Sequence, residues 1–313
     1  MNKLLVSSIT AIVLTMVAGF SFLFFVIDTD KSSATAESEI EPIENQTEET
    51  KEQETLHPYP APSMDEVPAG EEGELIKLGQ AYHNETATAL DEYVGNTLSC
   101  ASCHVDGGTG EALDLIGIPQ TYPQYNPRAG KEVSLEDRIN GCFRRSMNGK
   151  PLPKEGEEMK AMVAYYTFIS KNVPNDIEAR PWAKLKKVEG DITNLNIEEG
   201  EELYKKSCIA CHGEDGSGGS TGIALWGDNS YNIGAGMARV RTAAGFIQAF
   251  MPAAPMGGYD KGTFTDEEAL NIAAYINSME RPDFPDKIND WPNGDAPDDA
   301  AYETLAGKKD TNQ

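Results

Sequence analysis

Basic residues are scarce in this chain of 313 residues. Lysine and arginine together number 26 against 51 aspartates and glutamates, so the formal net charge is −25 at pH 7. A protein that binds DNA or RNA presents a basic patch to the phosphate backbone. We therefore expect no nucleic-acid partner. Much of the acid lies in one stretch near the N-terminus, so the net charge describes a linker and a surface more than a fold.

Charge is absent from residues 4–27, a run dominated by leucine, valine, isoleucine and phenylalanine. Such a helix spans a hydrocarbon core of roughly 30 Å, whereas a cleavable signal has only about 7–15 apolar residues. The small-residue pattern at 34–36 could be a cleavage site, but charged residues separate it from the run. We expect residues 1–28 to anchor the chain in the membrane. Lys3 precedes the run and acidic residues follow it, so we expect most of the chain to lie at the extracytoplasmic face of the membrane.

Apolar residues are few in residues 29–70, which are rich in glutamate, serine, threonine and proline. A stretch that repels itself and has little to bury is predicted to be a disordered acidic linker. Residues 283–313 have a similar composition and are predicted to form an acidic, disordered C-terminal tail. Two segments of similar plan lie between, at 71–185 and 186–282. Each reads as helix, CxxCH, loops and helix, which suggests a weak internal duplication.

Cysteine is rare too, and four of the five cysteines lie in two CxxCH motifs. This motif attaches c-type haem: two thiols reach the two vinyl groups of one porphyrin, and the histidine beside them binds the iron. A disulfide, a redox CxxC or half a zinc site are the alternatives for a single motif. Two motifs, each behind an amphipathic helix, favour two covalently bound haem c groups. The expected attachment and proximal residues are Cys100, Cys103, His104, Cys208, Cys211 and His212.

The fold predicted from this plan is all-α, with two cytochrome c-like mono-haem domains in tandem after the membrane helix and the linker. The closing helix of the second domain starts with a capping box, Thr265 followed by Glu268, and Leu270, Ala273 and Ile276 form its apolar stripe. Little β structure is expected.

The sixth ligand of the second iron is predicted to be a methionine between His212 and the last helix. Met251 is favoured because a proline follows it and can hold the sulfur rigidly toward the iron. Met256 and Met237 remain alternatives. A thioether ligand raises the reduction potential, which suits an electron exit.

The first segment offers a cysteine at the matching place. Cys142, the cysteine outside the two motifs, lies 38 residues after His104, and Met251 lies 39 residues after His212. If the segments are duplicates, Cys142 occupies the distal-ligand position of the first haem. A buried core cysteine and a nucleophile are the other interpretations of its thiol. His83, Met147, Met159 and Met162 are alternative ligands, although Met159 and Met162 lie on a helical core stripe.

Cations gather around Cys142 in a chain that has few. Arg138, Arg144, Arg145 and Lys150 lie close in sequence, and Arg128 lies a little upstream. They could be solvated or could pair with haem propionates. Several cations beside a thiol also lower its pKa toward thiolate and attract small anions. A thiolate is both the better iron ligand and the better nucleophile.

Four stretches resemble the tetrathionate-forming thiosulfate dehydrogenases, a family of di-haem c-type cytochromes: VGNTLSCASCH, YNPRAG, DRINGCFRRSMNGKPLP and ALWGDNSYNIGAGM. The third, around Cys142, is the most specific. The resemblance implies that Cys142 is the distal ligand and catalytic sulfur of the first haem. It also implies that Arg128 and Arg138 are substrate-site arginines and that Met251 is the second haem's ligand.

The function implied is oxidation of two thiosulfates to tetrathionate, or the reverse, with electrons leaving through the second haem to a redox partner such as another cytochrome or a terminal oxidase. The alternative is a membrane-tethered electron shuttle without substrate chemistry, in which Cys142 is merely buried. An acidic surface and a long tether would suit such a shuttle.

Overall fold

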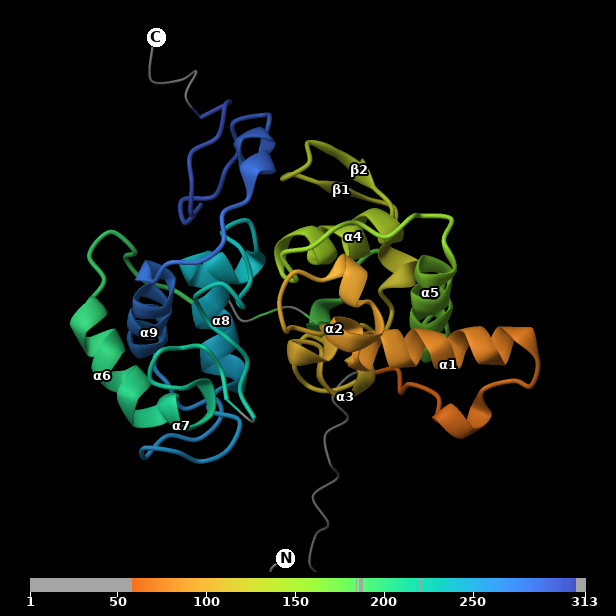
Figure 1. The fold of residues 1–313 in the computed structure, drawn as a ribbon, viewed down its shortest axis with the longest axis horizontal. Helices are drawn as coiled ribbons and strands as arrows, with labels where there is room; N and C mark the ends of the chain where they lie inside the picture. The colour runs from red at the N-terminus through yellow and green to blue at the C-terminus, as the bar shows by residue number, and fades with distance from the viewer. Residues whose placement is uncertain (1–57, 184, 186–187, 220, 308–313) are drawn as a thin grey trace, which may run out of the picture. The chain divides into compact units, whose positions relative to one another are not determined.

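The computed structural model describes residues 58–183, 185, 188–219 and 221–307. The predicted membrane helix at residues 1–28 and most of the predicted linker lie outside these ranges. Among the residues described, no helix is both long enough and apolar enough to cross a bilayer. The described chain is mostly helical, as expected, and its helices form two groups (Figure 1).

The first group is built on two long helices that cross. Helix α1 (Glu71–Asn84) packs against α5 (Glu157–Ile169), and the short helices α2 (Thr86–Ala89) and α3 (Val105–Gly108) and the helix α4 (Leu135–Arg145) complete it. Gly79 makes the crossing possible. A Cβ at this position would lie 2.0 Å from the carbonyl oxygen of Ala161, so any side chain there would force the helices apart.

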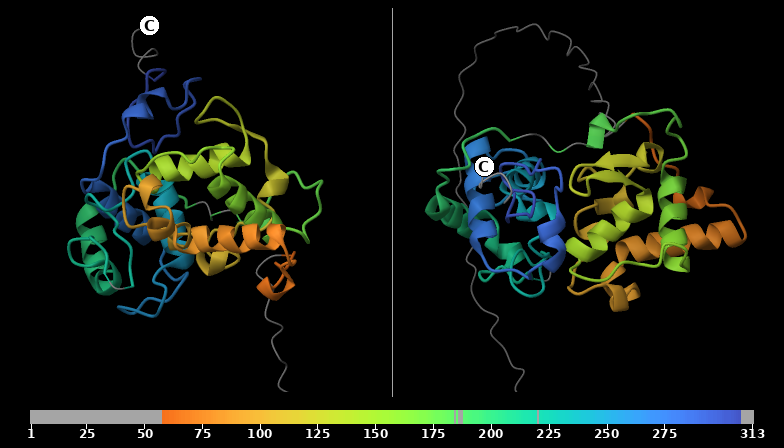
Figure 2. Two further views of the ribbon diagram at one scale, coloured as in Figure 1. Left: turned by 45° about the vertical axis from the view of Figure 1, so that its right-hand side comes forward. Right: turned by 90° about the horizontal axis from the view of Figure 1, so that it is seen from above.

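The second group repeats the arrangement. Helix α6 (Ile197–Ser207) packs against α9 (Asp266–Ser278), with α7 (Ile209–His212) and α8 (Val240–Phe250) beside them (Figure 2). Gly200 has the role of Gly79: its Cβ would lie 2.0 Å from the carbonyl oxygen of Asn271. The Thr265–Glu268 capping box is confirmed, and the apolar stripe of α9 is buried. The internal duplication predicted from the sequence is therefore visible in the helix pairing.

Each group has its own apolar core, and a small third cluster joins them. Leu98, just before the first CxxCH motif, packs with Tyr231, Ala235 and Ala238 of the second group. Polar contacts reinforce this junction, since the Asn96 amide donates to the carbonyl oxygens of Ser146 and Ser230.

The β structure described is one short hairpin. Strands β1 (Gln124–Asn126) and β2 (Lys131–Val133) pair antiparallel with Tyr125 opposite Glu132. Gly130 closes the turn at a φ of +64°, in the left-handed region that favours glycine. The hairpin leads directly into α4, which carries Cys142.

Two stretches predicted to be disordered are packed where the structure describes them. At the end of the linker, Ala61, Met64 and Val67 lie against the first core. Residues 283–307 fold over both helix groups, and Phe284 and Trp291 are buried. The composition is polar, as the prediction assumed, but these few apolar side chains find partners far away in the sequence.

Candidate haem and substrate site

The first CxxCH motif lies on a tight turn that holds its histidine in one tautomer. Cys100 begins a 3-10 turn capped by Ser99, and the His104 ring follows it. His104 Nδ1 lies 2.5 Å from the carbonyl oxygen of Leu113. A carbonyl oxygen can only accept, so Nδ1 carries the proton and the Nε2 lone pair is available to a metal.

The second motif has the same geometry on α7. His212 Nδ1 lies 2.9 Å from the carbonyl oxygen of Ile223, which again leaves Nε2 as the unprotonated nitrogen. A histidine that binds iron needs a fixed ring orientation and an unprotonated nitrogen facing the metal, and both histidines meet these conditions. The residues therefore fit two c-type haems.

A pocket in the first helix group brings the predicted residues of the first site together. Cys100, Cys103 and His104 line one part of it, and Cys142 and Arg138 of α4 line another. Most other lining residues are apolar, including Leu115, Ile118, Leu135, Ile139 and Phe143. Haem attachment residues and the fifth cysteine thus share one apolar chamber.

The Cys142 sulfur accepts a hydrogen bond from Arg138, whose Nη1 lies 2.9 Å from it. The two residues are four positions apart on α4, so they lie on the same helix face. The charge of Cys142 is the main cause that raises the pKa of Arg138, and Tyr122 acts in the same direction. A fixed cation therefore sits against the sulfur.

Helix α4 holds its position through its ends. Ser134 and Asp137 form a capping box at the N-terminus, and Arg144 and Arg145 lie in the last turn, where positive charge is favourable. Phe143 is fully buried and fixes the face of the helix that turns inward. These features orient Cys142 toward the cavity.

The structure shows the surroundings of each alternative ligand of the first haem. His83 is fully buried, with Nε2 at 2.9 Å from the carbonyl oxygen of His104 and Nδ1 at 3.1 Å from the Tyr166 hydroxyl. Both ring nitrogens therefore have protein partners. Met159 belongs to the first core, and Met147 and Met162 are core residues that also line the cavity.

For the second haem, Met251 lies at the end of α8 and packs against the second core, as Cys208 also does. Met237 lies in the cluster that joins the two helix groups, and the Met256 backbone pairs with Tyr259. Of the three candidates, Met251 is the one that packs against the same core as the attachment cysteine Cys208.

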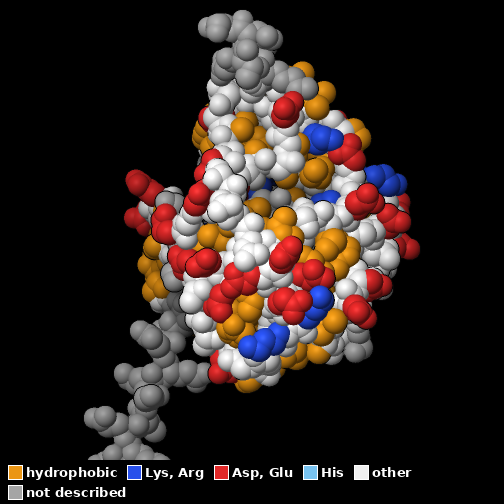
Figure 3. All heavy atoms as spheres, turned by 90° about the vertical axis from the view of Figure 1, so that its left-hand side faces the viewer, with side chains coloured by type: hydrophobic (Ala, Val, Ile, Leu, Met, Phe, Trp, Pro, Cys, Tyr) orange, Lys and Arg blue, Asp and Glu red, His pale blue; other side chains and the backbone are white. Residues whose placement is uncertain are grey.

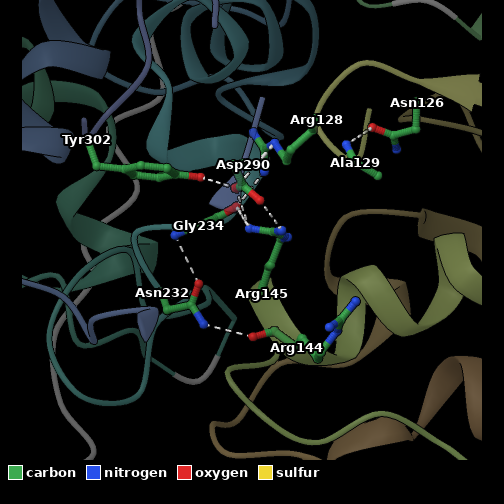
Figure 4. A network of polar contacts seen from close by, with 9 residues as sticks. All are labelled: Asn126, Arg128, Ala129, Arg144, Arg145, Asn232, Gly234, Asp290 and Tyr302. Atoms are coloured by element: carbon green, nitrogen blue, oxygen red, sulfur yellow. Dashed lines mark hydrogen bonds and ion pairs between the residues drawn. The ribbon is translucent and has the colours of Figure 1, made fainter. Parts of the chain in front are cut away.

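Arg128 contacts residues from the second half of the chain. It is not among the residues that line the cavity; its Nη1 donates to the carbonyl oxygen of Gly234 at 2.6 Å, and its Nε lies 3.9 Å from Asp290. Arg145 binds the same carboxylate with two hydrogen bonds, at 2.8 and 2.9 Å (Figure 4). Arg144 and Lys150 are exposed. The role of Asp290 was missed because its stretch looked like a disordered tail.

Comparisons with known proteins agree with this geometry. Residues 91–174 match the SoxA/TsdA cytochrome c domain, and residues 197–280 match the cytochrome c family. With the two CxxCH motifs inside these ranges, the chain carries two covalently bound c-type haems.

Named relatives match over most of the chain. A thiosulfate dehydrogenase of Psychrobacter arcticus is 38% identical over 247 residues, which cover 76% of this chain and 73% of the relative. That of Allochromatium vinosum is 37% identical over 236 residues, 72% of this chain and 84% of the relative. The solved thiosulfate dehydrogenase (TsdBA) from Marichromatium purpuratum, in its as-isolated form, matches with a TM-score of 0.67 and 33% identity. The match covers 72% of this chain and 50% of that longer one.

Proposed function

Because the chain belongs to the thiosulfate dehydrogenase family, we propose that it oxidises two thiosulfates to tetrathionate at Cys142. The observation that carries the proposal is the shared cavity: His104, Cys142 and Arg138 line one chamber, and Arg138 donates to the Cys142 sulfur. An electron-transfer domain needs no cysteine paired with an arginine in its haem chamber. An enzyme that handles a sulfur dianion has a use for both.

The chemistry balances as a sulfur exchange. The Cys142 thiolate bonds to the sulfane sulfur of one thiosulfate, and two electrons leave, giving a cysteine S-thiosulfonate. A second thiosulfate attacks the sulfane sulfur bonded to Cys142, the bond from that sulfur to Cys142 breaks, tetrathionate departs, and the Cys142 thiolate returns. When bound, the two haems supply a one-electron acceptor each. The same steps in reverse reduce tetrathionate.

Arg138 has two tasks in this scheme. Its guanidinium stabilises the negative charge of the Cys142 thiolate, and it offsets the repulsion between that thiolate and an incoming dianion. A guanidinium already in place at 2.9 Å does this without reorganisation during the reaction. Arg138 is therefore a catalytic residue in this proposal, together with Cys142.

The second domain passes the electrons on. His212 and Met251 are the proposed iron ligands there, and an external cytochrome or terminal oxidase is the proposed acceptor. Acidic side chains spread over the face of the second domain shown in Figure 3, which suits a basic partner. The apolar run at residues 4–27 would hold the protein at the extracytoplasmic face of the membrane.

Replacement of Cys142 tests the proposal. Cys142→Ala should abolish thiosulfate-dependent reduction of ferricyanide and the formation of tetrathionate, because no sulfur is left to carry the first thiosulfate. Gly141→Ala is the matched control, since a Cβ at this neighbouring position on α4 meets nothing within 4 Å. Retained turnover in Cys142→Ala with both haems attached would contradict the proposal and favour the electron shuttle.

A further inference from the structure

Asp290 connects two arginines of the first domain to the C-terminal segment, defined as residues 283–307. The Asp290 side chain is 7% exposed and accepts two hydrogen bonds from Arg145 in a fork-to-fork arrangement. The same carboxylate lies 3.9 Å from Arg128 and accepts a hydrogen bond from the Tyr302 hydroxyl (Figure 4). One carboxylate thus binds two arginines of the first domain and a tyrosine of its own segment.

Aromatic rings of the C-terminal segment hold the same two arginines from another side. The Arg145 guanidinium lies 4.3 Å from the ring centre of Phe284, and that of Arg128 lies 4.6 Å from the ring centre of Trp291. The backbone joins in, because the Trp291 amide donates to the carbonyl oxygen of Arg128 at 2.9 Å. These contacts fix both the place and the plane of each guanidinium.

The charges explain why a carboxylate is needed. The pKa of Arg128 is lowered to about 10, chiefly by burial and also by the nearby charges of Arg145 and Arg239, while Tyr302 and Asp290 act in the opposite direction. Arginines packed together and largely removed from water repel one another. The negative charge of the Asp290 carboxylate offsets this repulsion and allows Arg128 and Arg145 to lie close together.

Helix α4 links this network to the cavity. Arg145 lies three residues after Cys142, and Arg138, which contacts the Cys142 sulfur, lies four residues before it. Residues three and four apart are neighbours on a helix surface. The end of α4 that Asp290 fixes is therefore one turn from the sulfur.

We propose that Asp290 is a positioning residue for thiosulfate oxidation, which fixes Arg128 and Arg145 so that their charge draws the dianion toward the Cys142 end of the cavity. The inference rests on the proposed function. Asp290 lies outside the cavity lining, so its loss should weaken capture of thiosulfate and leave the later steps intact. If Asp290 merely neutralised the arginines, its loss would instead strengthen capture.

Steady-state kinetics of three variants measure this directly. Asp290→Asn and Asp290→Ala should raise KM for thiosulfate roughly tenfold, the scale of a lost hydrogen bond to a charged group, with kcat within about twofold. Tyr302→Phe, which removes only one hydrogen bond to Asp290, should raise KM less. Asp298→Asn is the matched control: it removes the same charge from the same segment, but its partner is Arg241.

A labelling experiment reports the arginine positions without any substrate. Phenylglyoxal should react slowly with Arg128 and Arg145 in the wild type, whose side chains are 18% and 17% exposed, and several-fold faster in Asp290→Asn. Asp298→Asn should match the wild type, and the exposed Arg144 gives the reference rate within each sample. Mass spectrometry assigns the modified residues, and haem absorbance verifies folding of each variant.

The outcomes separate the two proposals. Unchanged labelling, or an unchanged or lowered KM in Asp290→Asn with an active wild type, overturns the role of Asp290 alone. A wild type that does not oxidise thiosulfate contradicts the proposed function and removes the positioning role with it. Faster labelling together with a raised KM supports both.

Discussion

Arg138 touches the sulfur on which the account depends, and α4 carries a second arginine that does not. Both arginines are exposed, but Arg138 lies 2.9 Å from the Cys142 sulfur, whereas the structure describes no contact between Arg144 and that sulfur. Replacing each arginine in turn therefore distinguishes the effect of a cation beside the sulfur from the effect of the total positive charge of α4.

Arg138→Ala should lower kcat/KM for thiosulfate by about 10²-fold, the usual effect of removing one fixed electrostatic contact in an active site. Arg138→Lys should recover part of the loss, because an ammonium keeps the charge but not the fork geometry. Arg144→Ala should stay within about twofold of the wild type. Equal losses in Arg138→Ala and Arg144→Ala would show that only the overall charge of α4 matters.

The residues of the site differ in how far the sequence could predict them. The haem attachment residues are local in sequence, so the motif alone identifies them. Cys142 was placed by comparing its spacing from His104 with that of Met251 from His212, and the structure does put it in the first cavity. Asp290 could not be found in this way, because its arginine partners are more than a hundred residues away and no spacing rule links them.

At the scale of helices, the two crossings of long helices depend on close backbone contact at a glycine. In the first domain a Cβ on Gly79 would meet the carbonyl oxygen of Ala161 at 2.0 Å, which only a shift of α1 or α5 could relieve. Gly141 on α4 is the opposite case, with open space around its absent Cβ.

Gly79→Ala should destabilise the first domain by about 2–3 kcal/mol, the typical effect of overpacking at a tight contact. Gly141→Ala should be neutral or stabilise it by up to about 1 kcal/mol, because alanine is the better helix former. Unfolding of the haem-loaded protein by guanidinium chloride, followed by absorbance, compares the midpoints. A Gly79→Ala midpoint equal to the wild type would mean that the helices do not meet as described.

The helix pairs and the C-terminal segment differ in how well the amino-acid composition predicts their structure. The helix pairs follow from apolar periodicity and capping signals, and they were predicted correctly. The C-terminal segment was predicted to be disordered because it contains few apolar residues. It is ordered since Phe284 and Trp291 stack on arginines and Asp290 pairs with them, and such interactions leave no periodic signal.

For the whole molecule, the excess of acid governs encounters with electron acceptors. The formal net charge is −25, and acidic side chains are visible over the face of the second domain in Figure 3. Long-range attraction or repulsion of this kind is screened by salt, since the Debye length shrinks from about 30 Å at 0.01 M to about 8 Å at 0.15 M.

The rate constant for a cationic acceptor, such as hexaammineruthenium(III), should fall at least several-fold between these ionic strengths, and the rate constant for ferricyanide should rise. The measurement is kcat/KM for each acceptor at saturating thiosulfate, with a neutral quinone as the control that should not change. The same salt dependence for all three acceptors would show that surface charge does not steer the electron exit.

The central claim is that Cys142 and His104 bind the same iron in the first domain and that the reaction takes place there. Low-temperature electron paramagnetic resonance of the oxidised, haem-loaded protein tests it most directly. The account predicts a low-spin signal of a histidine- and thiolate-ligated iron that disappears in Cys142→Ala, while the signal of the second haem stays. A wild-type spectrum without a thiolate signal, unchanged in Cys142→Ala, would contradict it.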